Sequence, residues 1–340
     1  MAEADQRVGP GEDGLIARYF APLSQNFPGA FALRDDAAII APPDGTELVV
    51  TTDALIAGVH FLPDDTPGDI AYKSLAVNVS DLAAKAAQPL AYSLALAMPR
   101  GWREEWLAGF AEGLREAQET FGIALCGGDT TVSPAGPLMI AITALGSVPS
   151  GRMIRRGGAQ QGDLLYATGT IGDAALGLKL RRDDADTQGW PLDEAARRQL
   201  IGRYLRPEPR LGLRDALLAH ASAAMDISDG LVIDCKRMCE ASGVGGRIEA
   251  RHVPLSPAAQ ILVSADASTF ERVLTGGDDY EILATIRAGE AQPFEAAANA
   301  AGIRVSRIGE IAQPGGGLTV VGADGQAMNF ARPGYDHLAM

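Results

Sequence analysis

Carboxylates gather at six places in this chain, five of them with glycine, serine or threonine beside them, and that pattern raises the question of metal chemistry. Hard divalent cations such as Mg²⁺ take oxygen ligands, usually carboxylates together with waters and substrate phosphates. Each place also has an ordinary alternative, because Asp and Ser cap helices and Asp-Gly pairs form turns. The six places are Asp35-Asp36, Thr51-Thr52-Asp53, Asn78-Val79-Ser80-Asp81, Gly127-Gly128-Asp129-Thr130-Thr131, Asp226-Ile227-Ser228-Asp229-Gly230 and Gly276-Gly277-Asp278-Asp279.

As a set, these places favour a shared cation site over six separate caps. Each lies at the end of an element that the sequence predicts, and we expect strand ends to meet along one edge of a sheet. Several unpaired carboxylates in one place would repel one another and raise one another's pKa values, so such a cluster is stable only with cations. Asp81 keeps both interpretations open, because a helix would place it four residues before Lys85, at the spacing of an ordinary ion pair.

Motifs that are missing narrow the chemistry further. The chain has no GxxxxGK[ST] phosphate loop, no GxGxxG after a predicted strand, no GxSxG turn and no HExxH. An enzyme with this sequence that handles phosphate would therefore use metal ions, glycine-rich backbone amides and a few arginines.

Length and composition predict a two-domain protein of the cytoplasm. The 340 residues suit two domains of about 150–190 residues. A formal net charge of −14 argues against nucleic acid or an anionic membrane surface as a partner. We expect neither a signal peptide nor a membrane span, because no apolar stretch approaches ~20 residues. Cys126, Cys235 and Cys239 form no CxxC pair, which predicts buried thiols in a reducing compartment.

Hydrophobic patterning predicts the elements that would position the carboxylates. Apolar residues recur every three or four positions over 103–122, as on one face of a helix. A glycine- and arginine-rich stretch at 148–162 predicts a boundary between domains 1–148 and 149–340. Helices and strands mix without strict alternation, which favours an α+β or mixed α/β fold. The patterning predicts helices over 14–23, 69–87, 103–122 and 172–180, strands over 36–40, 47–53, 90–99, 123–131, 137–148 and 163–169, a charged loop over 181–194, strand-turn-helix over 222–242, helix-turn-strand over 268–286 and a strand within 301–311.

In their order along the chain, the motifs resemble those of the thiamine-monophosphate kinases, a family of the aminoimidazole-ribonucleotide-synthetase-like ATP-binding superfamily. The resemblance extends over nearly the whole chain. The segments that show it are GEDGLIARYF, DDAA, TTDALIAGVHF, AYKSLAVNVSDLAA, GGDTT, GTIGDAALGL, LRPEPRL, MDISDGL, GGDDYEIL and the terminal GYDH.

The resemblance implies two α/β domains, of which the N-terminal one binds ATP and Mg²⁺ and forms a homodimer through its sheet. It implies transfer of the γ-phosphoryl group of ATP to thiamine monophosphate, the last step in making thiamine diphosphate. The acceptor is a phosphate oxygen whose second pKa is ~6, so it needs no general base. The enzyme would position two polyanions in line and neutralise them with several Mg²⁺ ions.

Individual residues match the family's functional positions. Asp53, Asp129 and Asp229 would act electrostatically. Gly128, Asp129 and Ser228 match positions that contact the nucleotide, and Arg155 matches an arginine on the ATP phosphates. His60 and Asp278 match positions that hold the thiamine part, and Tyr335 would stack on its cationic rings. The positions that match the family's magnesium ligands are Asp36, Thr51, Thr52, Asp53, Asp81, Asp129, Asp226 and Asp229.

Three positions depart from the family pattern. Arg34 stands where glycine is usual, which places a cation beside the expected metal ligands. Asp278 replaces a glutamate and has a shorter reach. Lys85 stands where a neutral residue is usual.

Other members of the superfamily fit the sequence less well. Selenophosphate synthetase would have a reactive Cys in a glycine-rich N-terminal loop, whereas residues 1–50 contain none. The hydrogenase-maturation protein would end in Cys, whereas this chain ends in Met340. Aminoimidazole-ribonucleotide synthetase would lack the TTD…GVHF and GYDH segments. A non-catalytic scaffold would have lost the aspartates that this chain retains.

Overall fold

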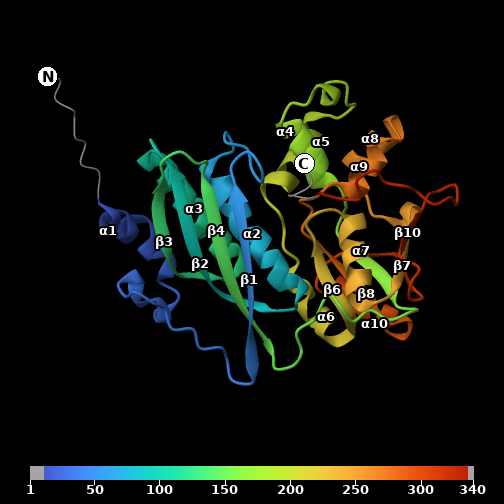
Figure 1. Ribbon diagram of the computed structural model, residues 1–340, viewed down its shortest axis with the longest axis horizontal. Helices are drawn as coiled ribbons and strands as arrows, with labels where there is room; N and C mark the ends of the chain where they lie inside the picture. Colours follow the sequence, from blue (N-terminus) through green and yellow to red (C-terminus); the bar gives the residue numbers. More distant parts are fainter. Residues whose placement is uncertain (1–10, 336–340) are drawn as a thin grey trace. The chain divides into compact units, whose positions relative to one another are not determined.

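The structure is a computed structural model that describes residues 11–335, and the chain divides into two compact units. The first unit consists of Met1–Asp44, Val50–Asn78 and Pro89–Gly146, and the second of Gly45–Val49, Val79–Gln88 and Ser147–Met340. Helix α2 (Pro67–Ala84) therefore contributes residues to both units. Figure 1 shows the elements of each unit along the sequence.

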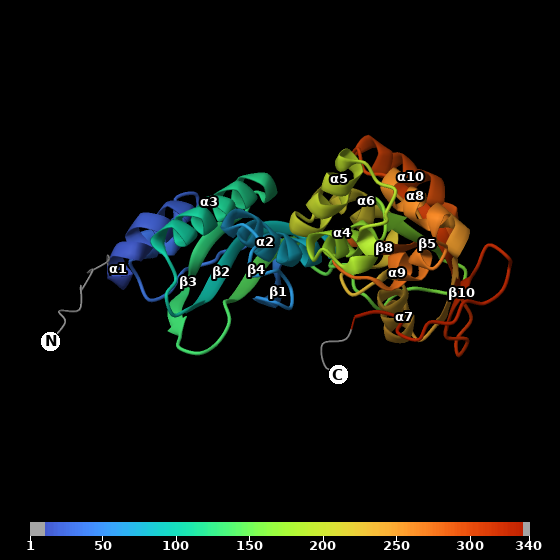
Figure 2. The ribbon, with the colours of Figure 1, turned by 90° about the horizontal axis from the view of Figure 1, so that it is seen from above.

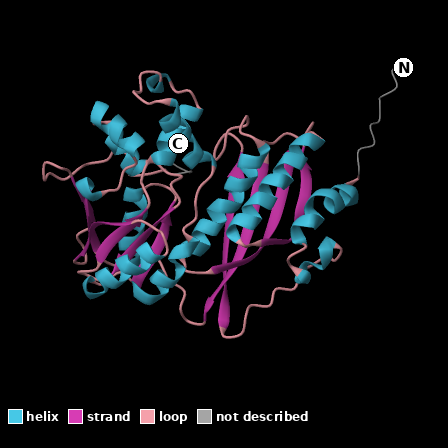
Figure 3. Cartoon of the chain, turned by 180° about the vertical axis from the view of Figure 1, so that it is seen from behind, coloured by secondary structure: helices cyan, strands magenta, loops and turns pink. Residues whose placement is uncertain are grey.

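A four-stranded sheet forms the frame of the first unit. Its order is β1-β4-β2-β3, and β2 runs parallel to β3. Parallel neighbours need a long crossover, which α3 (Glu104–Phe121) provides. Helices α2 and α3 lie on one face of the sheet (Figures 1 and 3). The strands are β1 (Thr46–Ile56), β2 (Gln88–Pro99), β3 (Ala124–Ser133) and β4 (Met139–Pro149).

Helix α3 confirms the amphipathic pattern. It ends at Gly122, whose left-handed φ of 65° lets its N–H reach the Gln118 carbonyl at 2.9 Å. It packs closely on α2, because a Cβ added at Gly113 would lie 2.4 Å from the Gly68 carbonyl oxygen. Its buried apolar face includes Leu107, Phe110, Leu114, Ala117 and Phe121.

The N-terminal segment differs from expectation in two elements. The helix predicted over 14–23 forms as three short turns of different type, α1 (Glu12–Leu15), η1 (Ile16–Phe20) and η2 (Ala21–Ser24), followed by η3 (Pro28–Leu33). The strand predicted over 36–40 is wrong: residues 35–37 form a bend, and Ile39 is 65% exposed. Its N–H bonds only the Gly29 carbonyl, and Pro42-Pro43 beyond it lack the donors that a ladder needs.

A six-stranded mixed sheet forms the frame of the second unit. Its order is β10-β7-β9-β5-β8-β6, with β10 and β7 parallel and the other paired neighbours antiparallel. Strands β5 and β8 are buried on both faces, so their alternate residues enter two different cores. Leu165 belongs to one core and Tyr166 to the other. The strands are β5 (Leu164–Thr168), β6 (Ala221–Ile227), β7 (Gly245–Glu249), β8 (Glu281–Ile286), β9 (Val305–Ala312) and β10 (Leu318–Val321).

Helices cover both faces of this second sheet (Figure 2). One core receives side chains from α4 (Asp173–Arg181), α5 (Glu194–Leu205), α7 (Leu231–Ser242), α8 (Pro257–Ala265) and α9 (Thr269–Thr275). The other receives them from α6 (Arg214–His220), α10 (Ala291–Ala300) and the end of α2. Short 3-10 turns are η4 (Ala185–Thr187), η5 (Leu211–Leu213), η6 (Ala250–His252) and η7 (Ala288–Glu290).

Several elements of the second unit were not predicted from the sequence: α5, α6, α8, α10, β7 and β10. Helix α5 shows the reason, because it buries only Leu200 and Tyr204 and so has a sparse apolar stripe. The three cysteines are free and buried, which confirms the prediction of buried thiols. A search of the described helices finds none that is long and apolar enough to span a bilayer.

We expect Gly113→Ala to destabilise the first unit by about 1–2 kcal/mol, because the added methyl meets backbone of α2 that cannot move aside cheaply. The matched control is Gly202→Ala in α5, where an added Cβ meets no atom within 4 Å. That change should stabilise by about 0.5–1 kcal/mol through helix propensity alone. Urea titration followed by circular dichroism measures both, and equal shifts of the same sign would contradict the close contact.

Candidate active site

The C-terminal end of β6 places a buried carboxylate next to α2. Asp226 is 7% exposed, and the Ser80 hydroxyl donates to its Oδ2 at 2.9 Å. Burial raises the pKa of Asp226 well above its usual range, and the negative charge of Asp81 raises that pKa further. The second unit therefore brings two of the predicted metal ligands, Asp81 and Asp226, close enough for their charges to interact.

Lys85 places a positive charge near Asp81 and Asp226. Its Nζ donates to the Ala224 carbonyl at 2.8 Å, and burial lowers its pKa. The negative charges of Asp226 and Asp81 act in the opposite direction and raise the pKa of Lys85. The position where the family pattern has a neutral residue thus places one positive charge among two negative ones.

Asp229 lies in a tight turn that Asp234 holds together. The buried Asp234 carboxylate accepts the N–H groups of Ser228 at 3.1 Å and Asp229 at 2.9 Å. Burial raises the pKa of Asp234 to about 6. Arg237 forms ion pairs with Asp234, at 2.8 Å, and with Asp229. Asp234 and Arg237 were not predicted as site residues, although their positions one and two turns into α7 were a usable signal.

Two distant segments reach the same turn through backbone hydrogen bonds. The Asp278 N–H donates to the Ser228 carbonyl at 2.8 Å, and the Tyr335 N–H donates to the Asp229 carbonyl at 3.0 Å. The Tyr335 residue is 48% exposed. Two predicted thiamine-holding residues therefore flank the predicted metal and nucleotide positions of β6. Of the terminal GYDH segment, residues 336 and 337 lie outside the described part of the chain.

Arg155 lies beside β6 but makes its described contact there through backbone. Its carbonyl accepts the Ala224 N–H at 3.1 Å, and its side chain is exposed. An exposed guanidinium in this place is available to a phosphate, which keeps its predicted role open.

In the first unit, Thr51, Thr52 and Asp53 lie inside β1 and not at its end, because the strand continues to Ile56. The Asp53 N–H donates to Asn78 Oδ1 of α2 at 3.1 Å. Thr52 and Thr143 join hydroxyls at 2.9 Å on the other face of the sheet. Alternation along the strand therefore directs Asp53 towards the helix-covered face and Thr52 away from it.

His60 follows β1 in a turn that holds its ring. Its Nδ1 accepts the Ile56 N–H at 3.0 Å, so this nitrogen has no hydrogen in that arrangement. The neutral ring then has its hydrogen on Nε2. This tautomer can donate to a substrate oxygen and does not act as a base through Nδ1.

Gly128 and Asp129 lie within β3 and not at its end. A Cβ at Gly128 would come 2.0 Å from the Leu94 carbonyl oxygen of β2, so this strand contact requires glycine. Asp129 is exposed and pairs with Ala95 of β2, which is also exposed. The alternate residues of β2, Leu94 and Leu96, are buried. Asp129 therefore belongs to the face that α2 and α3 leave open.

The strand order of the first sheet separates Asp53 and Asp129, which the sequence pattern predicts to lie together. Two strands stand between β1 and β3, which corresponds to about 14 Å at ~4.8 Å per strand. Asp53 and Asp129 therefore do not bind the same ion within one copy of this sheet, and Asp36 lies in the exposed bend before β1. Among residues 11–335, no group of three or more His, Cys, Asp or Glu is arranged to hold a metal ion.

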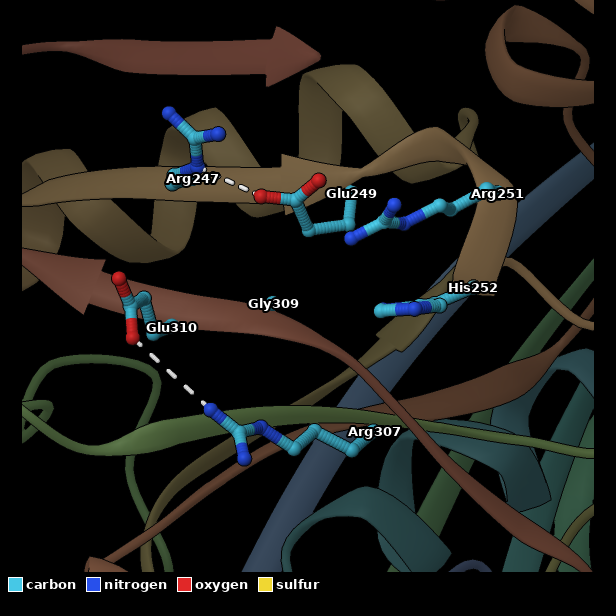
Figure 4. A pocket seen from close by; sticks show the side chains of 7 residues that line it. All are labelled: Arg247, Glu249, Arg251, His252, Arg307, Gly309 and Glu310. Atoms are coloured by element: carbon cyan, nitrogen blue, oxygen red, sulfur yellow. Dashed lines mark hydrogen bonds and ion pairs between the residues drawn. The ribbon is translucent and has the colours of Figure 1, made fainter. Parts of the chain in front are cut away.

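A pocket of a different kind lies over β7 and β9 (Figure 4). Arg247 pairs with Glu249 at 2.7 Å and Arg307 with Glu310 at 3.9 Å. Strand β5 and β8 separate this end of the sheet from β6, so the pocket is remote from the turn at Asp229. No predicted site residue lines it; its lining is Arg247, Glu249, Arg251, His252, Arg307, Gly309 and Glu310.

Comparison with known proteins covers both units. The model of the AIR synthase related protein N-terminal domain matches residues 34–148, and that of the C-terminal domain matches residues 160–321. The thiamine-monophosphate kinase of Caulobacter vibrioides is 43% identical over 316 residues, covering 92% of this chain and 87% of the relative.

Solved structures agree with these matches. The crystal structure of thiamine-monophosphate kinase from Stenotrophomonas maltophilia K279a has a TM-score of 0.78 and 39% identity, and the match covers 87% of this chain and 91% of that one. AaThiL complexed with AMPPCP and TMP has a TM-score of 0.75 and 30% identity, with 89% and 91% covered.

These matches confirm the predicted two-domain mixed fold. Their identity and coverage also exceed what a shared fold alone would give. The chain belongs to the AIR synthase related family, among its thiamine-monophosphate kinases.

Proposed function

We propose that this kinase transfers the γ-phosphoryl group of ATP directly to the phosphate of thiamine monophosphate, with several Mg²⁺ ions. Support comes from family membership and from the relative whose structure holds AMPPCP and TMP. The geometric observation behind the proposal is the turn at the end of β6. The Ser228 and Asp229 carbonyls there accept the N–H groups of Asp278 and Tyr335, just after Asp226 of β6.

The buried carboxylates suit Mg²⁺ by their chemistry. Asp81 and Asp226 offer hard oxygen ligands, and burial together with the charge of Asp81 raises the pKa of Asp226. When bound, Mg²⁺ would neutralise the phosphates of both substrates. Ser80 would orient the Asp226 carboxylate, and Arg237 would hold Asp229 in place.

No side chain needs to remove a proton from the acceptor. The phosphate of thiamine monophosphate is largely ionised near neutral pH. His60 fits the role of a hydrogen-bond donor to substrate, because its Nδ1 already accepts a backbone N–H. Asp278 and Tyr335 would then hold the cationic thiamine part, by charge and by stacking.

The first unit would supply the nucleotide side of the reaction. Gly128 would contact the nucleotide through its backbone, and the Leu94 carbonyl of β2 fills the space that a Cβ would take there. Arg155 would contact the ATP phosphates. The remaining proposed magnesium ligands are Asp36, Thr51, Thr52, Asp53, Asp129 and Asp229.

The open face of the four-stranded sheet supports the proposed homodimer. Val50 and Met139 are 58% and 39% exposed on strands β1 and β4. They share this face with Thr52, whose neighbours on alternate positions are also exposed. A second copy of the chain would cover these apolar side chains and bring further carboxylates to the face.

Purified protein should convert thiamine monophosphate to thiamine diphosphate with ATP and millimolar Mg²⁺. Chromatography of thiamine phosphates measures the product, and ADP should form in equal amount. Chelation with EDTA should stop turnover, and added Mg²⁺ should restore it. Folded protein that shows no turnover under these conditions would refute the proposed function.

Asp129→Asn should lower kcat by at least about 100-fold. Without the carboxylate the Mg²⁺ ion that it would hold is lost, and with it the positive charge that offsets repulsion between the phosphates. Asp44→Asn is the matched control, since Asp44 is an exposed turn residue before β1. Its kcat should equal that of the parent protein. Near-normal turnover in Asp129→Asn, with an unchanged circular dichroism spectrum, would remove Asp129 from the metal site.

Light scattering at micromolar concentration should give the mass of a dimer. Val50→Glu should shift the protein towards monomer, because a buried charge in the proposed interface has no partner. Ile261→Glu is the control, as Ile261 is 44% exposed on α8 of the second unit. A monomeric parent protein, or equal effects of the two changes, would contradict an interface on the first sheet.

A further inference from the structure

Two arginines near the LRPEPRL segment meet on one buried carboxylate. Glu281 is 0% exposed at the start of β8. Arg210 donates Nε to Glu281 Oε2 at 2.7 Å and Nη2 to Oε1, in a bidentate arrangement. Arg203 of α5 donates Nη2 to the same Oε1 at 2.9 Å. We call Arg203, Arg210 and Glu281 the arginine clamp.

The surroundings of the arginine clamp leave little freedom to Glu281. The Thr168 hydroxyl donates to Glu281 Oε2 at 2.5 Å and accepts the Ile282 N–H at 2.7 Å. At Gly169, an added Cβ would lie 2.0 Å from Glu281 Oε1, so a side chain there would displace the carboxylate.

Charge is balanced within the arginine clamp and its neighbour Glu208. Glu208 pairs with Arg203 at 3.2 Å and with Arg210 at 3.1 Å. Two positive and two negative groups therefore meet, and removal of one arginine would leave the buried Glu281 with one cationic partner in place of two.

The residues just before Glu281 have an unusual backbone. Asp278 has a φ of 72° and Tyr280 a φ of 50°, in the left-handed region that non-glycine residues rarely occupy. Such conformations persist only where the surroundings impose them, and they concentrate at functional sites. The strain here falls on the segment that holds Asp278, a proposed substrate contact.

Contacts on both sides of the strained residues impose this conformation. The N–H groups of Asp278 and Tyr280 donate to the Ser228 and Ile227 carbonyls, each at 2.8 Å. On the other side, Arg203 Nη2 approaches the Asp279 carbonyl at 3.3 Å. Together with Glu281, Arg203 thus connects the arginine clamp directly to the strained segment.

Asp279, which lies between Asp278 and Tyr280, is also held in place. Asp279 is 1% exposed, and its Oδ2 accepts the Gly172 N–H at 2.8 Å. With Asp279 directed inward and held, the backbone on either side can turn Asp278 towards the end of β6. Asp278 also accepts the Tyr280 hydroxyl at 3.3 Å.

We infer that Arg203 and Arg210 are positioning residues for the acceptor substrate: by holding Glu281 they keep Asp278 in its left-handed conformation. The inference rests on the proposed function, because it takes Asp278 to contact the thiamine part. It assigns the LRPEPRL segment a role that none of the metal or nucleotide residues explains.

Steady-state kinetics of Arg210→Gln and Arg210→Lys test the inference. In Arg210→Gln, KM for thiamine monophosphate should rise about 10- to 100-fold, as for loss of a charged hydrogen-bond pair, while KM for ATP stays within twofold. Arg210→Lys keeps the charge without the bidentate geometry and should give an intermediate KM. Arg115→Gln is the matched control, because Arg115 also pairs with two carboxylates, Glu112 and Glu119, but on an exposed helix face.

The outcomes separate this inference from the proposed function. A parent protein without kinase activity would refute the function itself. An active parent with an unchanged KM for thiamine monophosphate in folded Arg210→Gln, or an equal rise of both KM values, would overturn the positioning role. If Arg210→Gln does not fold, Arg203→Lys gives the same test, because it retains a cation near Glu281 but loses the reach to the Asp279 carbonyl. A selective rise in KM for thiamine monophosphate would then support the inference.

Discussion

Burial of carboxylates around the end of β6 is the constraint on which the second unit depends. Asp226, Asp234, Asp279 and Glu281 are all nearly or fully inaccessible, and an ionised group in that setting needs partners. Each has a different solution. Glu281 has two arginines, Asp234 has backbone N–H groups with Arg237, and Asp279 has the Gly172 N–H.

Asp226 is compensated less fully than Glu281 and Asp234, and in this it resembles Asp279, because burial raises the pKa of both aspartates well above the usual range. Ser80 gives Asp226 a hydrogen bond and Lys85 a nearby charge, but burial and Asp81 raise its pKa well above the usual range. A structural carboxylate would gain from a closer cation in the protein itself. A carboxylate that binds a metal ion in the reaction would not, because a fixed cation would compete for it. The oxygens of Asp226 and Asp81 are of the kind that a divalent cation prefers, which is the role proposed for them.

Much of this arrangement was predictable from the sequence. The period of Leu107, Phe110 and Leu114 predicted α3, and alternating residues predicted β2. Within the candidate site, the family resemblance of the MDISDGL and GGDDYEIL segments led us to expect Asp226, Ser228 and Asp278 in one site. The structure joins the two segments by backbone hydrogen bonds. Local patterns succeed here because helix and strand periods depend on neighbours within a few residues.

The sequence by itself determined which candidate oxygen ligands are present and which segments form the main helices and strands. Tertiary structure decided which of those ligands meet. Asp53 and Asp129 have similar local settings, yet the order β1-β4-β2-β3 places two strands between them. Likewise, Arg203 and Arg210 meet Glu281 from more than 70 positions away in sequence. Strand order and ion pairs between residues so far apart in sequence depend on packing of the whole core. The periodicity of neighbouring residues contains no information about them.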